Sequence, residues 1–340
     1  MATGQVHQTD VVIVGAGPVG LFAVFECGMV RLRCHVVDVL DDAGGQCTAL
    51  YPEKPIYDIP GFPRIEAAEL VARLKEQAAP FHPVYHLGEQ VQVLQPAADG
   101  GWQVTTSKGT IVHARAVIIA AGVGAFGPNR PPLSGIEAYE GRSVFYYVSQ
   151  REALRGRRVV IAGGGDSAVD WTLALADVAA RVSVIHRRDR FRAAPESEAR
   201  LKALVAEGKV DLVVPYQLHG LEGEEGQLRA VTVATLDGDV RRIEADVLLP
   251  FFGLSMSLGP IADWSLDLER HQIRVDPVTA ATSRPGVFAI GDIVSYPGKL
   301  KLILTGFAEA AVAARSAYAL VHPDAPLHFE YSTTSGVPAA

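Results

Sequence analysis

The sequence has little cysteine and no long uninterrupted hydrophobic run. Only three of its 340 residues are cysteine, Cys27, Cys34 and Cys47, and no two of them form a C-x-x-C pair. This pattern excludes a framework of paired disulfides. The longest apolar stretch, residues 11–25, is interrupted by three glycines and a proline. It therefore falls short of the roughly 18 consecutive apolar residues that a membrane-spanning helix needs, and we expect no membrane segment.

Concentrated positive charge is also missing. The formal net charge is −7, whereas a protein whose main partner is nucleic acid needs clustered Lys and Arg, so we do not expect a nucleic-acid partner. Residues 1–10 contain no Lys or Arg to begin a signal peptide, which favours a cytoplasmic protein. With 49% hydrophobic and 20% charged residues the chain should be globular, and its length favours two domains.

The strongest feature that is present is a strand, a Gly-rich turn and a helix. Residues 10–14, Asp-Val-Val-Ile-Val, predict a mostly apolar, buried strand, and the sequence Gly15-Ala-Gly-Pro-Val-Gly20 follows them. Residues 21–29 then predict an apolar helix, and residues 35–38 predict a second short strand that ends at Asp38. Together these segments predict a β-α-β unit.

The same pattern occurs again about 148 residues later. Residues 157–162 predict a strand before Gly163-Gly-Gly-Asp-Ser-Ala168, a helix extends to about residue 179, and residues 182–185 predict the returning strand. The spacing from the first glycine of the turn to the end of the returning strand is the same in both copies, because Gly15 to Asp38 and Gly163 to His186 both span 23 positions. The chain therefore contains two β-α-β units in one register.

Other segments complete a fold prediction. Further strands are predicted over residues 90–94, 102–106, 110–112, 116–122, 245–253 and 286–292, a helix over 302–320, and a tail without regular structure over 322–340. The fold class is therefore α/β, with two Rossmann-like dinucleotide-binding domains of three-layer ββα form, the second inserted into the first. We expect residues 1–122 with 286–340 to form the first domain and 123–285 to form the second.

Both Gly-rich turns are suited to a dinucleotide. Glycine lets the backbone turn tightly and approach a pyrophosphate, which then lies against the N–H groups and positive end of the helix. At the first turn, Asp38 can accept hydrogen bonds from a ribose hydroxyl, which predicts an unphosphorylated ribose as in FAD or NAD. Either turn could instead be an ordinary strand-to-helix connection with no ligand.

The second unit has the opposite charge at this position. Its second strand is followed by His186-Arg187-Arg188, with Arg190 and Arg192 close behind. Guanidinium groups bind a 2′-phosphate with paired charge-assisted hydrogen bonds, so this site predicts NADP rather than NAD. The alternative is that these arginines only form the solvent-exposed start of a helix and bind no phosphate.

Two dinucleotide sites in one chain suggest electron passage from a nicotinamide to a flavin, which can release electrons one or two at a time.

These motifs resemble the two-dinucleotide-binding flavoprotein reductases, a superfamily that includes the low-molecular-weight thioredoxin reductases. The resemblance covers nearly the whole chain. The residues that carry it are Gly15 to Gly20, Gly44-Gly-Gln46, the strand ending at Gly122, Gly163 to Ala168, His186 to Arg188, and Gly291-Asp292.

The thiol sites of related enzymes have no counterpart in this sequence. Thioredoxin reductases carry a C-x-x-C in the NADPH domain, whereas residues 143–152 contain no cysteine. Glutathione-reductase-like enzymes carry C-x-x-x-x-C after the first Gly-Gly turn, but Pro52 stands where the partner of Cys47 would be. Bacillithiol-type disulfide reductases use a cysteine in the first Gly-rich loop, which here has none. Cys47 is interpreted as a small buried filler, with a lone reactive thiol as the alternative.

The sequence is similar to the thioredoxin-reductase-like ferredoxin–NADP reductases. That resemblance implies FAD and NADPH as cofactors, a ferredoxin as redox partner, a homodimer, and a C-terminal extension, residues 329–335, lying over the flavin. A disordered tail is the alternative. Hydride would pass from NADPH to the flavin N5, and two single electrons would then pass to ferredoxin. Because this chemistry needs no side-chain acid or base, we predict no catalytic residue. We also predict no metal site.

The resemblance also implies which residues bind each cofactor. For FAD they are Gly15, Gly17, Val19 and Gly20 at the pyrophosphate, Asp38 at the ribose, Gln46 and Tyr51 at the flavin, Val91 at the adenine, Phe126 beside the cofactor, Asp292 at the ribityl or pyrophosphate region, and Thr333 from the tail. For NADPH they are Gly163, Gly165, Asp166, Ser167, His186, Arg187, Arg188 and Arg192. Candidate cations for docking an acidic ferredoxin are Arg64, Arg130, Lys299 and Lys301.

Other functions remain open at this point. A flavoprotein reductase of a disulfide or a quinone would carry almost the same motifs. A flavin monooxygenase would share both nucleotide folds, although the F-x-G-x-x-x-H-x-x-x-W/P pattern of its Baeyer-Villiger members is missing. A non-catalytic nucleotide sensor would bind the cofactors without passing electrons.

Overall fold

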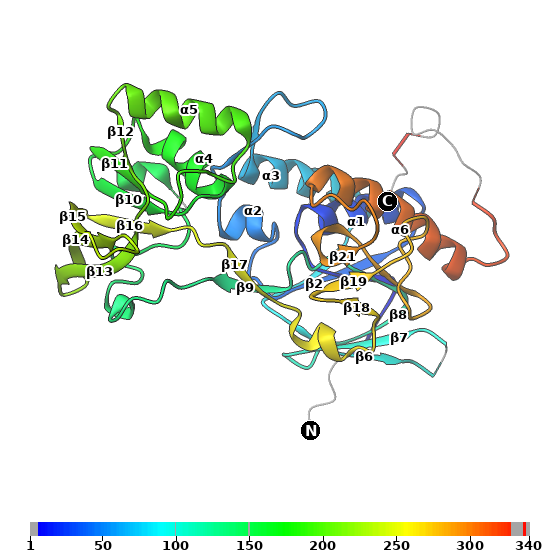
Figure 1. The fold of residues 1–340 in the computed structure, drawn as a ribbon. Coiled ribbons are helices and arrows are strands. Elements are labelled where there is room, and N and C mark those ends of the chain that lie inside the picture. The colour runs from blue at the N-terminus through cyan, green and yellow to red at the C-terminus, as the bar shows by residue number, and fades with distance from the viewer. Residues whose placement is uncertain (1–5, 99, 149, 328–335, 338–340) are drawn as a thin grey trace. The chain divides into compact units, whose positions relative to one another are not determined.

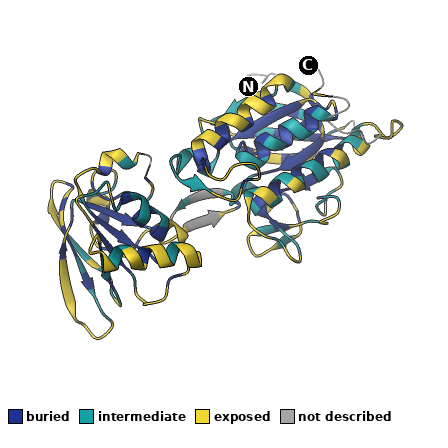
Figure 2. Cartoon of the chain, turned by 90° about the horizontal axis from the view of Figure 1, so that it is seen from above, coloured by how far each residue is buried: buried dark blue, intermediate teal, exposed yellow. Residues whose placement is uncertain are grey.

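The chain folds into two units. A computed structural model describes residues 6–98, 100–148, 150–327, 336 and 337. Residues Met1–Phe126 and Met256–Ala340 form the first unit, and Gly127–Ser255 form the second. In each unit the buried residues concentrate in the central sheet, while the helices expose one side to solvent (Figure 2). None of the helices in the described part of the chain combines the length and apolar character that crossing a membrane requires.

The first unit is built on a seven-stranded sheet (Figure 1). Its strands are β1 (Val6–Val14), β2 (Cys34–Asp38), β5 (Val84–Leu87), β6 (Val91–Pro96), β7 (Trp102–Thr106), β8 (Ile111–Ile119) and β20 (Val287–Ala289). The order is β5-β2-β1-β8-β7-β6, and β20 also pairs with β8. Strands β5, β2, β1, β8 and β20 are parallel, whereas β6, β7 and β8 form an antiparallel meander.

Three helices, α1 (Pro18–Met29), α3 (Ala67–Ala78) and α6 (Ile303–Val321), belong to the core on one side of this sheet. Helix α1 packs against both of the others. The close contact with α6 depends on Gly306, where a methyl group would lie 2.4 Å from Cγ2 of Val19. The predicted β-α-β unit and the predicted C-terminal helix are confirmed, the latter within one residue at each end.

The predicted break within β8 is wrong. We expected separate strands over residues 110–112 and 116–122, but β8 is continuous from Ile111 to Ile119. Its first half is held on both sides, since Ile111 to Ala114 pair with β1 and also with β7. These two sets of backbone hydrogen bonds keep the polar His113 extended, which no local pattern reveals.

The second boundary between the domains differs from the expected one. The chain returns to the first unit at residue 256, not 286. The reason is burial: Leu258, Ile261, Trp264 and Ile273 all join the core that the meander covers. The Trp264 indole also donates a hydrogen bond to the carbonyl of Gln92, at 3.4 Å. The first crossing, after Phe126, lies four residues beyond the expected one.

The second unit has a four-stranded parallel sheet in the order β12-β11-β10-β16. Its strands are β10 (Arg158–Ala162), β11 (Arg181–Ile185), β12 (Val210–Val213) and β16 (Val247–Pro250), and its helices are α4 (Asp166–Leu175) and α5 (Pro195–Ala206). An antiparallel sheet of β13 (Gln217–Glu224), β14 (Gln227–Ala234) and β15 (Val240–Glu244) shares a core with the parallel sheet. The predicted α/β class is thus confirmed, and the second unit shows its helix, sheet and sheet layers (Figure 1).

Helix α4 ends earlier than predicted, at Leu175 instead of about residue 179. The residues after it pair with the segment that precedes β10, because Ala180 donates to the carbonyl of Arg157 and Gly156 donates to that of Val178.

The remaining elements are short: α2 (Gln46–Ala49), β3 (Pro55–Ile56), β4 (Ile65–Glu66), β9 (Ala125–Pro128), β17 (Leu254–Ser257), β18 (Leu268–Glu269), β19 (Gln272–Arg274), β21 (Val294–Ser295), and 3-10 turns at Ala79–Phe81, Ile136–Ala138, Arg151–Leu154, Gly259–Asp263 and Gly291–Ile293.

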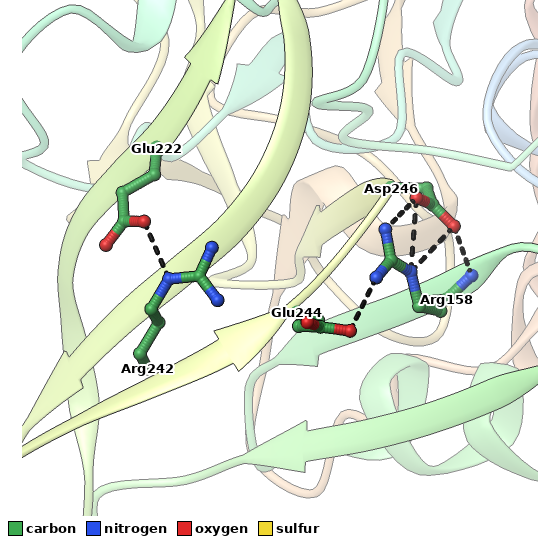
Figure 3. Close-up of polar contacts among 5 residues, drawn as sticks. All are labelled: Arg158, Glu222, Arg242, Glu244 and Asp246. Atoms are coloured by element: carbon green, nitrogen blue, oxygen red, sulfur yellow. Dashed lines mark hydrogen bonds and ion pairs between the residues drawn. The ribbon is translucent and has the colours of Figure 1, made fainter.

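Ion pairs hold the amino end of the second unit's parallel sheet (Figure 3). The Arg158 guanidinium donates to Oδ1 of Asp246 at 2.6 Å and to Oε2 of Glu244 at 2.7 Å. The backbone N–H of Arg158 donates to the same Asp246 carboxylate. Arg158 lowers the pKa of Asp246, chiefly through these side-chain hydrogen bonds. A second pair, Arg242 with Glu222, is single and more exposed.

Replacing Arg158 with alanine should lower the stability of the second unit by about 1–2 kcal/mol, because several charge-assisted hydrogen bonds are lost at a half-buried site. The control Arg242→Ala should cost less than about 0.5 kcal/mol. Hydrogen exchange of the β10 and β16 amides at pH 7 measures both. Since the folded pKa of Asp246 is lowered, the Arg158 contribution is present above the usual carboxylate pKa and is lost as the pH falls below it. Equal effects of the two variants would contradict this assignment.

Candidate functional site

A pocket in the first unit lies where the parallel strands β1, β2 and β8 end. Twenty-seven residues line it, and eight of them were predicted to contact FAD: Gly15, Gly17, Val19, Asp38, Gln46, Tyr51, Val91 and Asp292. These eight come from segments as far apart as the first turn and the turn after β20. Their convergence on one cavity at the carboxyl ends of parallel strands is the arrangement that dinucleotide sites use.

The glycines of the first turn have different tasks. Gly15 has φ +111°, and a methyl group there would lie 2.4 Å from the carbonyl oxygen of Ala120. A methyl group on Gly20 would lie 1.9 Å from the carbonyl oxygen of Gly15. Gly17 has more room, because a methyl group there would lie 4.0 Å from Cα of Gly45, and it faces the pocket. Gly20 does not line the pocket; it allows α1 to pack on the turn.

Asp38 is positioned by its backbone neighbours at the end of β2. Its Oδ2 accepts a hydrogen bond from the Ala16 N–H at 2.6 Å, and its Oδ1 accepts one from the Leu40 N–H at 2.8 Å. Burial raises the pKa of Asp38, and these hydrogen bonds lower it. Each carboxylate oxygen has a second lone pair, so both can still accept from a ligand hydroxyl.

The start of α1 leaves backbone donors for an anion. The helix begins at Pro18 after Gly17, and no side chain caps it. Because Pro18 has no N–H, the first free donors belong to the residues that follow it, beginning with Val19. A phosphate bound here would accept from these N–H groups at the positive end of the helix dipole.

Cys47 and Tyr51 lie together in the pocket wall. Burial raises the pKa of the Cys47 thiol to about 11, and burial also raises the pKa of Tyr51. Both groups are therefore protonated at neutral pH. All three cysteines of the chain are free and buried. The interpretation of Cys47 as a buried filler agrees with this setting, and a reactive thiolate does not.

The turn after β20 supplies Asp292 to the pocket. Burial raises the pKa of Asp292, while the charges of Lys299 and Lys301 lower it. The prediction that Lys299 offers a positive charge for docking ferredoxin is wrong. Its side chain is only 6% exposed and forms an ion pair with Glu309. Lys301 is exposed. Arg64 and Arg130 are exposed but form ion pairs with Glu66 and Glu140.

A second pocket lies in the second unit, at the carboxyl end of β10. Six predicted NADPH residues line it: Gly163, Gly165, His186, Arg187, Arg188 and Arg192. Asp166 and Ser167 do not, because they are the first residues of α4 beyond the turn. Arg190 also lines the pocket, and so do Tyr216 to Leu218 and Phe251 to Gly253.

The arginine segment folds back over the Gly-rich turn. The Arg192 N–H donates to the carbonyl of Gly164 at 2.6 Å, and the Ala194 N–H donates to Oδ1 of Asp166 at 3.0 Å. The His186 ring lies against Gly164, where a methyl group would be 2.2 Å from the ring. Burial lowers the pKa of His186, and the neighbouring arginines lower it further. Asp166 thus helps to place the arginines although it stays outside the pocket.

The two pockets have opposite charge. Among the described residues, the first is lined by three acids, Asp38, Glu89 and Asp292, and by no Lys or Arg. The second is lined by four arginines, residues 187, 188, 190 and 192, and by no Asp or Glu. An unphosphorylated ribose suits an acceptor carboxylate, whereas a 2′-phosphate suits guanidinium donors.

Some site residues could not be anticipated, and others are not described. Glu89, Gln90, Leu258, Pro260, Ile261, Trp264 and Ile303 line the first pocket without any local motif. Thr333 and residues 329–335 of the predicted flavin-covering tail lie outside the described residues, and so does the side chain of Phe126. In the described ranges, no group of three or more His, Cys, Asp or Glu side chains is arranged to hold a metal ion.

Known proteins are similar to this chain in sequence and in fold. A family model described as pyridine nucleotide-disulphide oxidoreductase matches residues 9–317. The ferredoxin–NADP reductase of Paramagnetospirillum magneticum is 67% identical over 98% of this chain and 98% of its own length. That of Rhodospirillum rubrum is 65% identical over 97% of each chain. Among solved structures, a thioredoxin reductase from Lactococcus lactis has a TM-score of 0.79 at 25% identity, covering 93% of this chain and 99% of its own.

The two tasks of the turn glycines can be separated by mutation. Gly20→Ala should destabilise the first unit by about 2–3 kcal/mol, because the added methyl group meets the Gly15 carbonyl and α1 must move. Gly17→Ala, the matched control, has φ −69° and should change stability by less than about 1 kcal/mol. Hydrogen exchange of the β1 and β2 amides measures both. A Gly17→Ala protein as unstable as Gly20→Ala would contradict the division.

Proposed function

This chain belongs to the pyridine nucleotide-disulphide oxidoreductase family, and within it to the ferredoxin–NADP reductases, and we propose that it passes electrons between NADPH and a ferredoxin by way of FAD. The observation that carries the proposal is the opposite charge of the two nucleotide pockets. One favours a dinucleotide with free ribose hydroxyls, and the other favours a dinucleotide with a 2′-phosphate.

FAD fits the first pocket by the chemistry of its donors and acceptors. The uncapped start of α1 offers N–H groups to a pyrophosphate beside Gly17 and Val19. Asp38 offers carboxylate acceptors to the adenosine ribose, and Val91 would border the adenine. Gln46 and Tyr51 would contact the isoalloxazine, and Asp292 the ribityl or pyrophosphate region. Phe126 and Thr333 remain predictions for the same cofactor. FAD supplies the exchange between a two-electron hydride carrier and a one-electron acceptor.

NADPH fits the second pocket. Gly163 and Gly165 would let the backbone approach its pyrophosphate, and the arginines would bind its 2′-phosphate. Asp166 would contribute through the hydrogen bond it accepts from Ala194, which helps to hold the arginine segment on the turn. Binding of NADPH by Ser167 remains a prediction, since Ser167 does not line the second pocket. Hydride transfer would need orientation and no side-chain acid or base, which is why no catalytic residue is assigned.

The state of the cysteines supports a one-electron acceptor over a disulfide. Reduction of a disulfide by this chain would need a thiolate or a dithiol beside the flavin. Cys47 is the cysteine that lines the first pocket; it is buried and protonated at neutral pH. Cys27 and Cys34 are buried between α1 and β2 and do not line the pocket.

Two broader features complete the proposal. We infer a homodimer, which the family resemblance implies, and a cytoplasmic location. Sedimentation equilibrium over micromolar concentrations tests the first. Cell fractionation tests the second.

Anaerobic stopped-flow absorbance tests the proposed reaction. The purified holoprotein is mixed with NADPH or NADH and then with oxidised ferredoxin. We expect NADPH to bleach the flavin rapidly, NADH to act weakly, and ferredoxin to restore the absorbance. Bleaching by NADPH without reoxidation by ferredoxin would refute the acceptor and point to a quinone or another partner. No bleaching would point to a nucleotide sensor, and substrate-coupled oxygen uptake would point to a monooxygenase.

Arg187 and Arg188 should determine the preference for NADPH. Replacing either with alanine removes charge-assisted hydrogen bonds to the 2′-phosphate, so kcat/KM for NADPH should fall about 10- to 100-fold, while kcat/KM for NADH changes less than about threefold. Arg181→Ala is the matched control, because Arg181 lies at the opposite end of β11 and pairs with Asp211. It should leave both values unchanged. An equal loss for NADPH and NADH would refute the role in 2′-phosphate recognition.

A further inference from the structure

Glu309 is a carboxylate on α6 that accepts three hydrogen bonds away from solvent. Its Oε2 accepts from the backbone N–H of Gly291 at 2.6 Å. Its Oε1 accepts from the hydroxyl of Tyr296 at 2.6 Å and from the ammonium of Lys299. The side chain of Glu309 is 12% exposed and that of Lys299 is 6% exposed. Charged side chains are rarely buried to this extent, because removing their charges from water costs free energy.

The turn that Glu309 holds is the one that carries Asp292 into the first pocket. Gly291 has φ +80° and immediately follows the segment in which Ile290 bonds to the end of β8. Gln272, on β19, holds the other side of the turn: its side-chain amide donates to the carbonyls of Asp292 and Val294 at 3.1 and 2.8 Å. The turn is thus fixed at its N–H by Glu309 and at its carbonyls by Gln272.

Stability alone does not account for this choice of residues. Burying an ion pair costs desolvation that the attraction between the charges barely offsets, and a packed apolar pair of similar volume is often as stable. A carboxylate has a property that an apolar side chain lacks: it can accept from a backbone N–H, a phenol and an ammonium at the same time. Glu309 also holds the ammonium of Lys299, one of the two lysines whose charge reaches Asp292.

We propose that Glu309 is a positioning residue for FAD, which fixes the Gly291–Asp292 turn so that the Asp292 carboxylate faces the cofactor. The inference rests on the proposed function in one respect, namely that the first pocket binds FAD. Glu309 does not line that pocket and acts through Gly291 and Lys299. Its loss should therefore weaken FAD binding while the apoprotein stays folded.

The test is the dissociation constant of FAD from the full-length apoprotein, measured by quenching of flavin fluorescence. In Glu309→Gln, one carboxylate oxygen becomes an NH2 group that cannot accept a hydrogen bond, so either the Gly291 N–H or the Tyr296 hydroxyl and Lys299 ammonium lose their acceptor. The dissociation constant should therefore rise about 10-fold or more, equivalent to about 1.4 kcal/mol. Glu309→Asp keeps the charge, but its side chain is one methylene too short to reach the Gly291 N–H. It should therefore show a similar loss of FAD affinity. Because each variant weakens the pairing of the buried Lys299 ammonium, the thermal midpoint of its apoprotein should fall by up to about 10 °C, while the protein stays folded at the temperature of the titration.

The matched control is Glu26→Gln. Glu26 lies on α1 and pairs with Arg315 of α6, the helix that also carries Glu309, at 3.5 Å. Within the described part of the chain, no hydrogen bond or ion pair joins Glu26 to the Gly291 turn. Its FAD dissociation constant should stay within about twofold of the wild-type value. A value for Glu309→Gln equally close to wild type, full binding by Glu309→Asp, or an apoprotein that loses stability while FAD affinity is unchanged would each overturn the proposal. A wild-type protein that binds no FAD would instead refute the proposed function.

Discussion

The close backbone packing at the end of each parallel sheet is the constraint on which both nucleotide pockets depend. In the first unit, strand, turn and helix approach so closely that a methyl group at Gly20 would be 1.9 Å from the Gly15 carbonyl. In the second, the imidazole of His186 occupies the space that a side chain on Gly164 would need. Only with these contacts does each helix start at the sheet edge, where its free N–H groups can face a phosphate.

Charge then distinguishes two sites built on one plan. The equivalent position at the end of the second strand holds Asp38 in one unit and begins the segment His186-Arg187-Arg188 in the other. In the first unit two backbone N–H groups orient the carboxylate. In the second, hydrogen bonds from Arg192 and Ala194 hold the arginine segment on the turn. A chain in the ferredoxin–NADP reductase branch thus holds its two nucleotide sites apart in sequence and opposite in charge.

Residues outside the motifs hold parts of these sites in place. Glu309 and Gln272 hold the turn that carries Asp292, and they come from segments on either side of it in the sequence. Arg284 stacks on Trp102 at 4.2 Å and donates to the carbonyl of Trp264, which keeps residues 258–264 against the meander and beside the first pocket. These contacts join residues that are far apart in the sequence, so no local sequence pattern predicts them.

The sequence alone determined the two β-α-β units, the fold class and the Gly-rich turns that face the two pockets, because glycine spacing and strand periodicity express local backbone requirements. It also determined the different charge of the two sites, since Asp38 and the segment that begins at His186 occupy positions that the chain's own register defines. Only the tertiary structure decided that Gly20 serves packing rather than the pocket, that Lys299 is buried against Glu309, and that residues 256–285 belong to the first unit. Those outcomes depend on which distant segments share a core, and such contacts are set by packing and burial over the whole unit and not by neighbouring residues.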